Sequence, residues 1–507
     1  MKAQSSILPQ NSHDAVLAAH VHPPDWQNPE PAGRYNLVVI GAGTAGLVCA
    51  AGAAGLGAKV ALIERSLMGG DCLNVGCVPS KGMIGAARAL FAARGGEDFG
   101  VRGGAALDFD FPAAMERMRR LRAAISPHDS ARRFRDELGV DVFFGQGRFD
   151  GPDCIEVEGK QLRFHRAALC TGGRAVLPPV SGLVEAEPYT NETVFTLTEL
   201  PKRLAVIGGG PIGCELAQTF ARFGSRVTLV HHGSHLLGRE DADAAAILQD
   251  VFVREGIDLR LQTAITRVER HWLEKSIRFQ QEGLAHEIGV DAILVAAGRI
   301  PNIEGLDLEA AGIEFDRNGV RVDDRLQTTN PRVYAAGDIC SAFKFTHTAD
   351  AQARILIANA LFKGRQRVSR LVVPWCTYTD PEIAHVGLYD YEAQAKGIPV
   401  ATLTVPLSQV DRAILDGETE GFARIHLRKG TDTILGATIV ARHAGEMIGE
   451  LSLAITSGLG LAAIGRTIHP YPTQAEAIKK LADAYNRSRL TRSVKKLLGG
   501  WLAWQRR

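Results

Sequence analysis

The 507-residue chain lacks several features that would assign it to a class at once. No window holds 18 uninterrupted apolar residues, so a membrane-spanning helix is not expected. Eight cysteines are too few for a disulfide scaffold, and a formal net charge of +2 gives no indication of a nucleic-acid partner. The first residues, MKAQSSILPQNSHD, show no basic head before an apolar run, so no secretory leader is expected. These absences favour a cytoplasmic protein, in which a pair of cysteines is more often reactive than structural.

Glycine, in contrast, is abundant, and its 54 residues suit α/β units whose tight turns bind phosphate. One such unit begins with YNLVVI at residues 35–40, an apolar run typical of a buried parallel strand. The turn GAGTAG follows at 41–46, a helix is expected over 45–56, and a second strand over 59–63 ends at Glu64. This order predicts a dinucleotide-binding βαβ unit.

The three glycines of this turn and the terminal acid have separate roles in such a unit. Gly41 permits the tight turn, Gly43 lets the backbone approach a pyrophosphate, and Gly46 lets helix and strand pack closely. The helix N-terminus attracts the phosphate charge, and Glu64 is placed to bind the ribose hydroxyls.

The same pattern recurs further along the chain. A strand over 203–207 leads into GGGPIG, a helix is expected over 214–223, and a second strand covers 226–230. The glycines equivalent to those of the first turn are Gly208, Gly210 and Gly213. Two such units predict two dinucleotides, one of which donates electrons to the other.

The second unit ends differently from the first. His231 and His232 stand where Glu64 ends the earlier strand, so no carboxylate is present to bind a ribose hydroxyl pair or to repel a 2′-phosphate. This favours NADPH over NADH, although the arginine that usually binds the 2′-phosphate is missing and both nucleotides stay open.

Two cysteines follow the first unit within GGDCLNVGCVPSK, residues 69–81. The spacing of Cys72 and Cys77 at the start of a predicted helix puts their sulfurs about one helical turn apart, near enough to form a disulfide. A helix N-terminus lowers the pKa of a thiol, so a thiolate is expected near neutral pH. A thiol pair beside a bound dinucleotide predicts transfer of two electrons from cofactor to sulfur.

From about residue 35 to 485 the chain resembles the class I, FAD-dependent pyridine nucleotide-disulfide oxidoreductases, which include glutathione reductase, dihydrolipoyl dehydrogenase and mercuric reductase. Beyond the two βαβ units and the thiol motif, three segments match that family: CTGGR at 170–174, AAGRIPN at 296–302 and VYAAGD at 333–338. The resemblance implies an α/β fold with two Rossmann-type domains, for FAD and NAD(P), and a C-terminal α+β dimerisation domain.

The resemblance also implies an order of domains and a homodimer in which the C-terminal domain of one subunit completes the active site of the other. The expected segments are an N-terminal extension (1–34), the FAD domain (35–183 and 301–368), the NAD(P) domain (184–300), the dimerisation domain (369–485) and a basic amphipathic tail (486–507).

Family roles can be carried over to matching positions. Cys77 would face the flavin as the thiolate, and Cys72 would meet the acceptor. Lys81 would lie at flavin N5 and pair with Glu215 of the second Rossmann helix. Other positions implied for cofactor binding are Gly70, Thr171 and Gly172, Asp338 at the ribitol of FAD, and Gly298 with Arg299 in the turn after the nicotinamide domain. Pro211 replaces a tyrosine that in some relatives shields the flavin.

The acceptor site is implied by HPYPTQAE, residues 469–476. The motif Pro-Thr-x-x-Glu puts Tyr471 where disulfide reductases have a histidine base, with Glu476 as its orienting acid. Tyrosine is a poor base at neutral pH, and mercuric reductases also have a tyrosine there. This favours a metal ion as acceptor. If His469 acts as the base instead, a dihydrolipoyl dehydrogenase or glutathione-type reductase is indicated.

The resemblance to mercuric reductase is incomplete. No cysteine follows Cys376, so that enzyme's C-terminal cysteine pair is unmatched, and none precedes Cys49, so its N-terminal metal-binding domain is unmatched too. Copper, quinones or a small disulfide therefore stay open as acceptors.

The tail, residues 486–507, holds seven Lys or Arg and no acid. On a helix, one face would carry Leu490, Val494, Leu497, Leu498, Trp501 and Leu502. Such a helix can lie on an anionic membrane or pack on the protein's own dimer. A membrane-docked flavin redox sensor is the alternative outside enzymology. Near the other end, His20 and His22 are expected to be surface residues rather than metal ligands.

Overall fold

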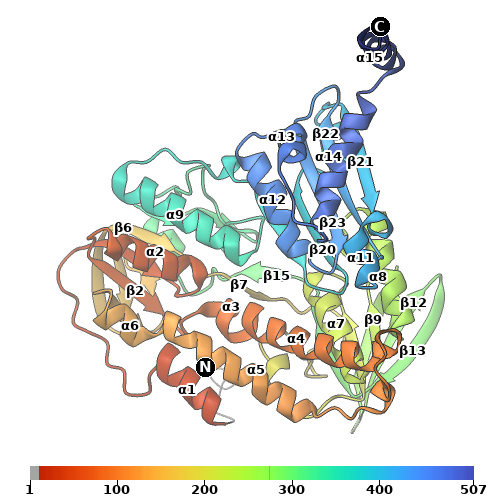
Figure 1. Cartoon of the computed structure of the whole chain (residues 1–507). Coiled ribbons are helices and arrows are strands. Elements are labelled where there is room, and N and C mark those ends of the chain that lie inside the picture. Colours follow the sequence, from red (N-terminus) through yellow and green to blue (C-terminus); the bar gives the residue numbers. More distant parts are fainter. Residues whose placement is uncertain (1–10, 273) are drawn as a thin grey trace. The chain divides into compact units, whose positions relative to one another are not determined.

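The computed structural model describes residues 11–272 and 274–507, and its chain forms two compact units (Figure 1). The larger unit holds the described residues up to Ser234 together with Val253–Leu371. The C-terminal unit holds His235–Phe252 and Val372–Arg507. The domain boundaries expected above stay predictions.

The first sheet of the larger unit runs β3-β2-β1-β6-β5-β4, with β18 also paired to β6. The pairs among β3, β2, β1, β6 and β18 are parallel, and β4-β5-β6 is antiparallel. The strands are β1 (Tyr35–Ile40), β2 (Val60–Glu64), β3 (Asp141–Phe144), β4 (Arg148–Phe149), β5 (Cys154–Val157), β6 (Lys160–Leu169) and β18 (Val333–Ala335). Helices α2 (Thr44–Gly55) and α9 (Thr346–Phe362) contact each other and share its core. The predicted first βαβ unit is confirmed.

The cysteine motif forms two helices and not the start of one. Cys72 lies within α3 (Gly70–Val75), and Cys77 is the first residue of α4 (Cys77–Arg94). The break falls at Gly76, where a Cβ would lie 2.7 Å from the carbonyl oxygen of Asp71. The single-helix prediction was wrong because the backbone turns back on itself here, which only a residue without a side chain allows.

The second sheet runs β10-β9-β8-β14 and is parallel throughout. Its strands are β8 (Arg203–Ile207), β9 (Arg226–Val230), β10 (Asp258–Arg260) and β14 (Ala292–Val295). Strands β8 and β9 match their predicted bounds, whereas α7 (Pro211–Phe223) begins three residues earlier than expected because proline suits the first turn of a helix. The remaining strands of this unit are β11 (Ala264–Arg270), β12 (Lys275–Gln281), β13 (Leu284–Val290), β7 (Gly173–Ala175), β15 (Arg299–Pro301), β16 (Phe315–Asp316) and β17 (Gly319–Val320).

The C-terminal unit is built on an antiparallel sheet of order β19-β20-β23-β22-β21, and helices pack against its core. The strands are β19 (Pro374–Thr377), β20 (Glu382–Gly387), β21 (Val400–Pro406), β22 (Phe422–Arg428) and β23 (Ile434–Ala441). The helices are α8 (Ala242–Arg254, whose last two residues belong to the larger unit), α10 (Asp390–Ala395), α11 (Asp411–Leu415), α12 (Ala444–Thr456), α13 (Leu461–Arg466), α14 (Glu476–Ser488) and α15 (Arg492–Gln505). The α+β prediction is confirmed. Among the described residues, we find no helix with the length and apolar character needed to cross a bilayer.

A helix that the sequence did not predict, α1 (Ser12–Val21), packs onto α5 (Phe111–Ile125). Leu17 and Val21 are fully buried, and the carbonyl of Val21 accepts a hydrogen bond from Met68 N at 3.0 Å. His20 bonds Ser126 and His22 bonds the carbonyl of Ser66, so neither is the plain surface residue expected. The N-terminal segment is therefore part of the fold.

Asp14 anchors this helix by a buried ion pair. Its side chain is 5% exposed and accepts from Arg122 Nη2 at 2.8 Å, and Arg119 lies 3.8 Å away. Arg122 also donates to the carbonyl of Asn74, two residues beyond Cys72, at 2.7 Å. The pair thus joins the N-terminal helix to the cysteine segment.

We expect Asp14→Asn to lower the free energy of unfolding by about 3–5 kcal/mol, because it removes the counter-ion of the buried Arg122 guanidinium. Urea unfolding followed by circular dichroism measures this. Asp25→Asn is the matched control, since its pair with Arg132 is exposed, and it should leave the unfolding midpoint unchanged. Equal midpoints for the two variants would contradict this account of α1.

Candidate functional site

The two cysteines of the motif face each other across the α3–α4 break, each with a free thiol in this structure. The Cys72 thiol donates a hydrogen bond to Cys77, and this bond is the main reason that the pKa of Cys77 falls to about 6. The same contact raises the pKa of Cys72 well above its usual range. The Thr346 hydroxyl, 3.4 Å from Cys77 Sγ, also stabilises the Cys77 thiolate. The arrangement favours a thiolate at Cys77 and a protonated thiol at Cys72.

Lys81 and Glu215 are also brought together as expected. Lys81 Nζ on α4 lies 2.7 Å from Glu215 Oε2 on α7, and the Glu215 side chain is 7% exposed. The ammonium charge of Lys81 lowers the pKa of Cys77, while Glu215 opposes it. The pair therefore places a positive charge beside the thiolate and ties the second Rossmann helix to the helix that carries Cys77.

The first glycine turn has the shape that a dinucleotide requires. Gly41 adopts φ 98°, a left-handed conformation that side chains rarely take, and a Cβ there would overlap the carbonyl of Cys170. A Cβ on Gly70 would lie 2.6 Å from Gly43 Cα. The glycine turn and the start of the cysteine segment therefore pack so closely that Gly70 has no room for a side chain. This cradle fits FAD, whose pyrophosphate needs close backbone approach at a helix N-terminus.

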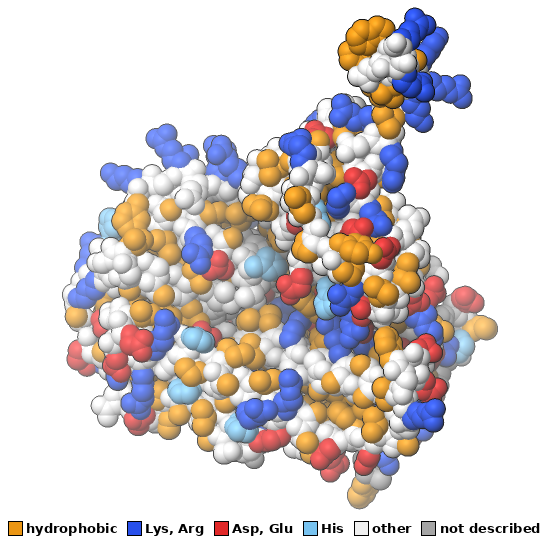
Figure 2. Space-filling view, in the orientation of Figure 1, with side chains coloured by type: hydrophobic (Ala, Val, Ile, Leu, Met, Phe, Trp, Pro, Cys, Tyr) orange, Lys and Arg blue, Asp and Glu red, His pale blue; other side chains and the backbone are white. Residues whose placement is uncertain are grey.

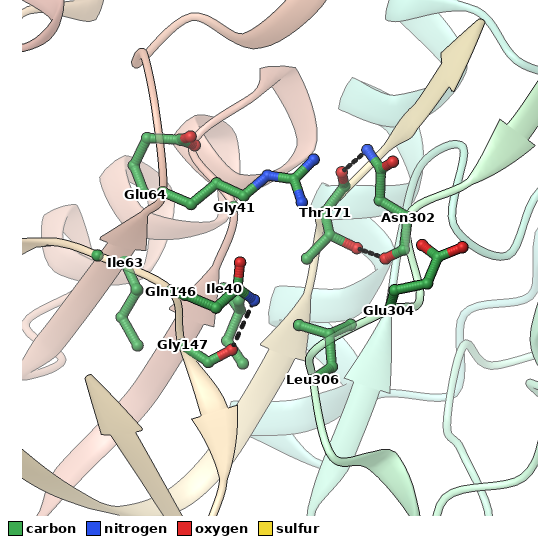
Figure 3. Close-up of a pocket in the computed structure, with 12 residues that line it drawn as sticks. Ile40, Gly41, Ile63, Glu64, Gln146, Gly147, Thr171, Asn302, Glu304 and Leu306 are labelled. Atoms are coloured by element: carbon green, nitrogen blue, oxygen red, sulfur yellow. Dashed lines mark hydrogen bonds between the residues drawn. The ribbon is translucent and has the colours of Figure 1, made fainter. Parts of the chain in front are cut away.

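Glu64 fixes that turn with both carboxylate oxygens. Oε2 accepts from Ala42 N and Oε1 from Ser66 N, each at 2.7 Å, and burial raises the pKa of the group. A small cavity opens beside it. Figure 3 shows Glu64 and Thr171 at this cavity, with Thr171 and Asn302 joined by two hydrogen bonds of 2.8 and 2.9 Å. The predicted residues Gly41, Glu64 and Thr171 thus line one cavity at the ends of parallel strands, where adenosine would bind.

Arg299 and Asp338 meet close to the cysteine segment. Arg299 Nε lies 3.4 Å from Asp338 Oδ2, and Nη2 donates to the carbonyl of Gly173 at 2.7 Å and to Asp71. Burial raises the pKa of Asp338, and the guanidinium of Arg299 opposes that shift. Asp71 is a residue that sequence reasoning passed over, although it precedes Cys72, because its partner is 228 positions away.

The second glycine turn has the same arrangement as the first, except that His231 stands in place of Glu64. A Cβ on Gly208 would overlap the carbonyl of Ala296, whereas Gly210 has open space around it, as a pyrophosphate site requires. His231 Nδ1 accepts from Gly209 N at 3.1 Å, the contact that Glu64 makes with Ala42 in the first unit. An accepting Nδ1 carries no proton, so the histidine holds the turn as a neutral ring.

In the C-terminal unit, Tyr471 and His469 have opposite environments. Tyr471 is 70% exposed and donates to Asp411 Oδ2 at 3.0 Å, which raises the pKa of Tyr471. The side chain of His469 is 6% exposed and lies 2.9 Å from Glu450 Oε1. Glu476 pairs with Lys480 at 3.3 Å, and its Oε2 has no hydrogen-bond partner among the described residues. The structure therefore does not give Glu476 the expected contact with Tyr471.

Comparison with known proteins identifies the family. The pattern described as pyridine nucleotide-disulphide oxidoreductase matches residues 35–353, and the dimerisation domain of the same family matches 373–482. The second match supports a homodimer.

Individual relatives match over most of the chain. Mercuric reductase of Lysinibacillus sphaericus is 34% identical over 455 residues, 90% of this chain and 83% of that protein. Dihydrolipoyl dehydrogenase of Thermus scotoductus is 35% identical over 460 residues, 89% of this chain and 98% of that protein. A solved structure titled as the Cu(II) complex of the HOCl-induced flavoprotein disulfide reductase RclA from Escherichia coli is 29% identical, with TM-score 0.79 over 88% of this chain and 99% of that one. The chain belongs to the pyridine nucleotide-disulphide oxidoreductases, enzymes that use FAD and NAD(P)H.

Proposed function

We propose that this enzyme passes electrons from NAD(P)H through FAD and the Cys72–Cys77 pair to a metal ion. The observation that carries the proposal is the unequal thiol pair, in which one hydrogen bond lowers the pKa of Cys77 to about 6 and raises that of Cys72. When bound, FAD supplies two-electron transfer between nicotinamide and sulfur.

After the disulfide is reduced, residues of the chain determine which sulfur carries the negative charge and which carries the proton. Cys77 keeps the negative charge, which Lys81 and the Thr346 hydroxyl stabilise, and Cys72 keeps the proton. One Hg²⁺ takes two electrons from this thiol and thiolate and leaves as the metal, or two Cu²⁺ take one electron each and leave as Cu⁺. In either case the S–S bond re-forms and one proton is released. Thiolates are also the ligands that soft metal ions prefer.

The C-terminal unit supports a metal ion over a disulfide. Exchange with an organic disulfide needs a base for the departing proton. The hydroxyl of Tyr471 is held by Asp411 with a raised pKa, so it is a donor, and His469 is occupied by Glu450. The names of two relatives, a mercuric reductase and a Cu(II) complex, agree with this choice.

A second candidate is a dihydrolipoyl dehydrogenase or glutathione-type activity. The 35% identity to a dihydrolipoyl dehydrogenase favours it, and it requires His469 to leave Glu450 and act as base. NADPH is the proposed donor, because the neutral ring of His231 stands where a carboxylate would repel a 2′-phosphate. The cytoplasm is the proposed compartment, since a reversible thiol pair suits a reducing environment.

The tail adds a proposed contact with an anionic membrane surface. All residues of α15 are exposed, Leu497 by 74%, although the helix has an apolar face. Figure 2 shows hydrophobic and basic side chains on opposite sides of this helix. It lies beyond residue 482, where the family's dimerisation domain ends. The seven Lys or Arg of the tail, residues 486–507, suit lipid phosphate better than a second copy of the same basic tail. The alternative function of this helix is in a redox sensor that binds the membrane only when the protein is reduced.

An acceptor screen on the FAD-loaded enzyme tests the main proposal. With NADPH as donor, we expect turnover with Cu²⁺ or Hg²⁺ and little with lipoamide or glutathione disulfide. Cys72→Ser and Cys77→Ser should each lower kcat/KM by at least about a hundredfold. The metal rate should fall below pH about 6, where the Cys77 thiolate becomes protonated. Turnover with lipoamide alone would select the second candidate.

Replacement of the two C-terminal residues separates the same candidates. Tyr471→Phe should slow the metal reaction by about three- to tenfold, the worth of one hydrogen bond. His469→Gln, which keeps a hydrogen-bond donor toward Glu450, should change the metal rate little. Steady-state kinetics measures both variants. If Tyr471→Phe leaves the rate unchanged and His469→Gln abolishes activity, His469 would instead be the base.

Vesicle sedimentation tests the tail. The intact protein should bind phosphatidylserine vesicles at low salt and phosphatidylcholine vesicles weakly, because the attraction is to anionic lipid. Trp501→Glu with Leu498→Glu should abolish binding, whereas Ser488→Glu, outside α15, should weaken it only slightly. Binding restricted to reduced protein would favour the sensor, and a change of oligomeric state without lipid binding would assign the face to a second copy.

A further inference from the structure

The segment that follows α1 contacts both walls of the cavity where adenosine would bind. We call residues 21–28 the N-terminal strap. The strap lies before residue 35, where the family pattern begins, and the function proposed above does not use it. One wall of the cavity is formed by Glu64 and Arg65 at the end of β2, and the other by residues 145–147 just after β3 (Figure 3).

The strap is hydrogen-bonded to the segment after β2 at two points. Nδ1 of His22 bonds the carbonyl of Ser66, and the carbonyl of Val21 accepts from Met68 N at 3.0 Å. Because a carbonyl can only accept, the His22 ring is the donor of its bond. Ser66 in turn donates its backbone N–H to Glu64 Oε1 at 2.7 Å. His22 therefore fixes the residue that fixes the carboxylate expected to bind the ribose.

The strap also covers the outer side of β3, an edge strand of its sheet. Asn28 Nδ2 donates to the carbonyl of Phe144, and Asn28 Oδ1 accepts from Phe144 N, both at 2.8 Å. The side-chain amide thus pairs with the edge strand as a neighbouring backbone would. The His22 ring stacks on the Phe144 ring with centroids 4.2 Å apart, and Trp26 meets that ring edge-on at 5.7 Å. Phe144 directly precedes Gly145, a residue of the cavity wall.

One side chain of the strap therefore bridges the two walls. His22 contacts the first wall through Ser66 and the second through Phe144. The walls also contact each other directly, since Gly145 N donates to the carbonyl of Glu64 at 3.0 Å. A ligand binds more tightly when the groups around it are already held in place, because less ordering is needed on binding.

We infer that the N-terminal strap is a positioning element for FAD, in which His22 and Asn28 hold the ends of β2 and β3 around the adenosine half and so slow its release. This role requires FAD to bind with its adenosine at the Glu64 cavity, and it is independent of the acceptor proposed above. Loss of the strap contacts should therefore weaken the retention of FAD and leave binding at the second dinucleotide site unchanged.

Release of FAD from the diluted holoenzyme, followed by timed ultrafiltration and the absorbance of the free flavin, tests this role. We expect His22→Ala and Asn28→Ala each to release FAD about tenfold faster than the parent enzyme, since each loses about two ordinary contacts. His22→Asn should recover part of the retention, because its amide can replace Nδ1 as donor to Ser66. Asn28→Ala carries the test if His22→Ala folds poorly.

Three measurements separate this role from general support of the fold. His20→Ala is the matched control, because His20 lies in the same segment but bonds the Ser126 hydroxyl at 2.8 Å, and it should release FAD at the parent rate. The Kd for NADP⁺ should be unchanged in the strap variants. Glu64→Ala should release FAD at least as fast as they do.

Four results would overturn the inference. Parent-like release from both His22→Ala and Asn28→Ala would mean that the strap has no role, and equally fast release from His20→Ala would mean general support of the N-terminal segment. Weaker NADP⁺ binding by the strap variants would mean a loosened fold. Parent-like release from Glu64→Ala would mean that adenosine binds elsewhere. None of these measurements involves the thiols or an acceptor, so failure of the metal screen would leave this inference intact.

Discussion

The proposed chemistry of this enzyme depends on one interaction, between the Cys72 thiol and the Cys77 sulfur. It gives two identical side chains opposite tendencies, one held as a thiol and the other as a thiolate near neutral pH. The two cysteines lie on either side of the break between α3 and α4. The proposed roles of the glycine turns, Lys81 and Thr346 all depend on this contact.

The surrounding fold keeps that contact in place from three directions. The Lys81–Glu215 pair joins it to the second Rossmann unit, and the Arg299–Asp71 pair joins it to the turn after that unit. Arg122 holds the carbonyl of Asn74 from the N-terminal side. In each case a charged side chain with little exposure (Glu215, Arg299 or Arg122) connects segments that are far apart in sequence, and its partner offsets the cost of removing it from water.

The sequence was sufficient wherever structure depends on local pattern. Strands β1 and β8 have their predicted bounds because short apolar runs end at glycine turns, and β9 has its predicted bounds because its apolar run ends at His231 and His232. The sequence alone did not show which residue would pair with a given charged side chain. Asp71 and Asp14 look like ordinary surface acids until Arg299 and Arg122 are placed beside them. Helix α1 was missed for the same reason, because its stability comes from α5 and from the Met68 segment, and its own sequence has little amphipathic pattern.

The bond between Val21 and Met68 has a consequence for where this protein begins as a folding unit. The family pattern starts at residue 35, yet the backbone that leads to Gly69 and Gly70 is hydrogen-bonded to the end of α1. A truncation made at residue 35 would remove Val21 and leave Met68 N, which directly precedes Gly69 and Gly70, without this hydrogen bond.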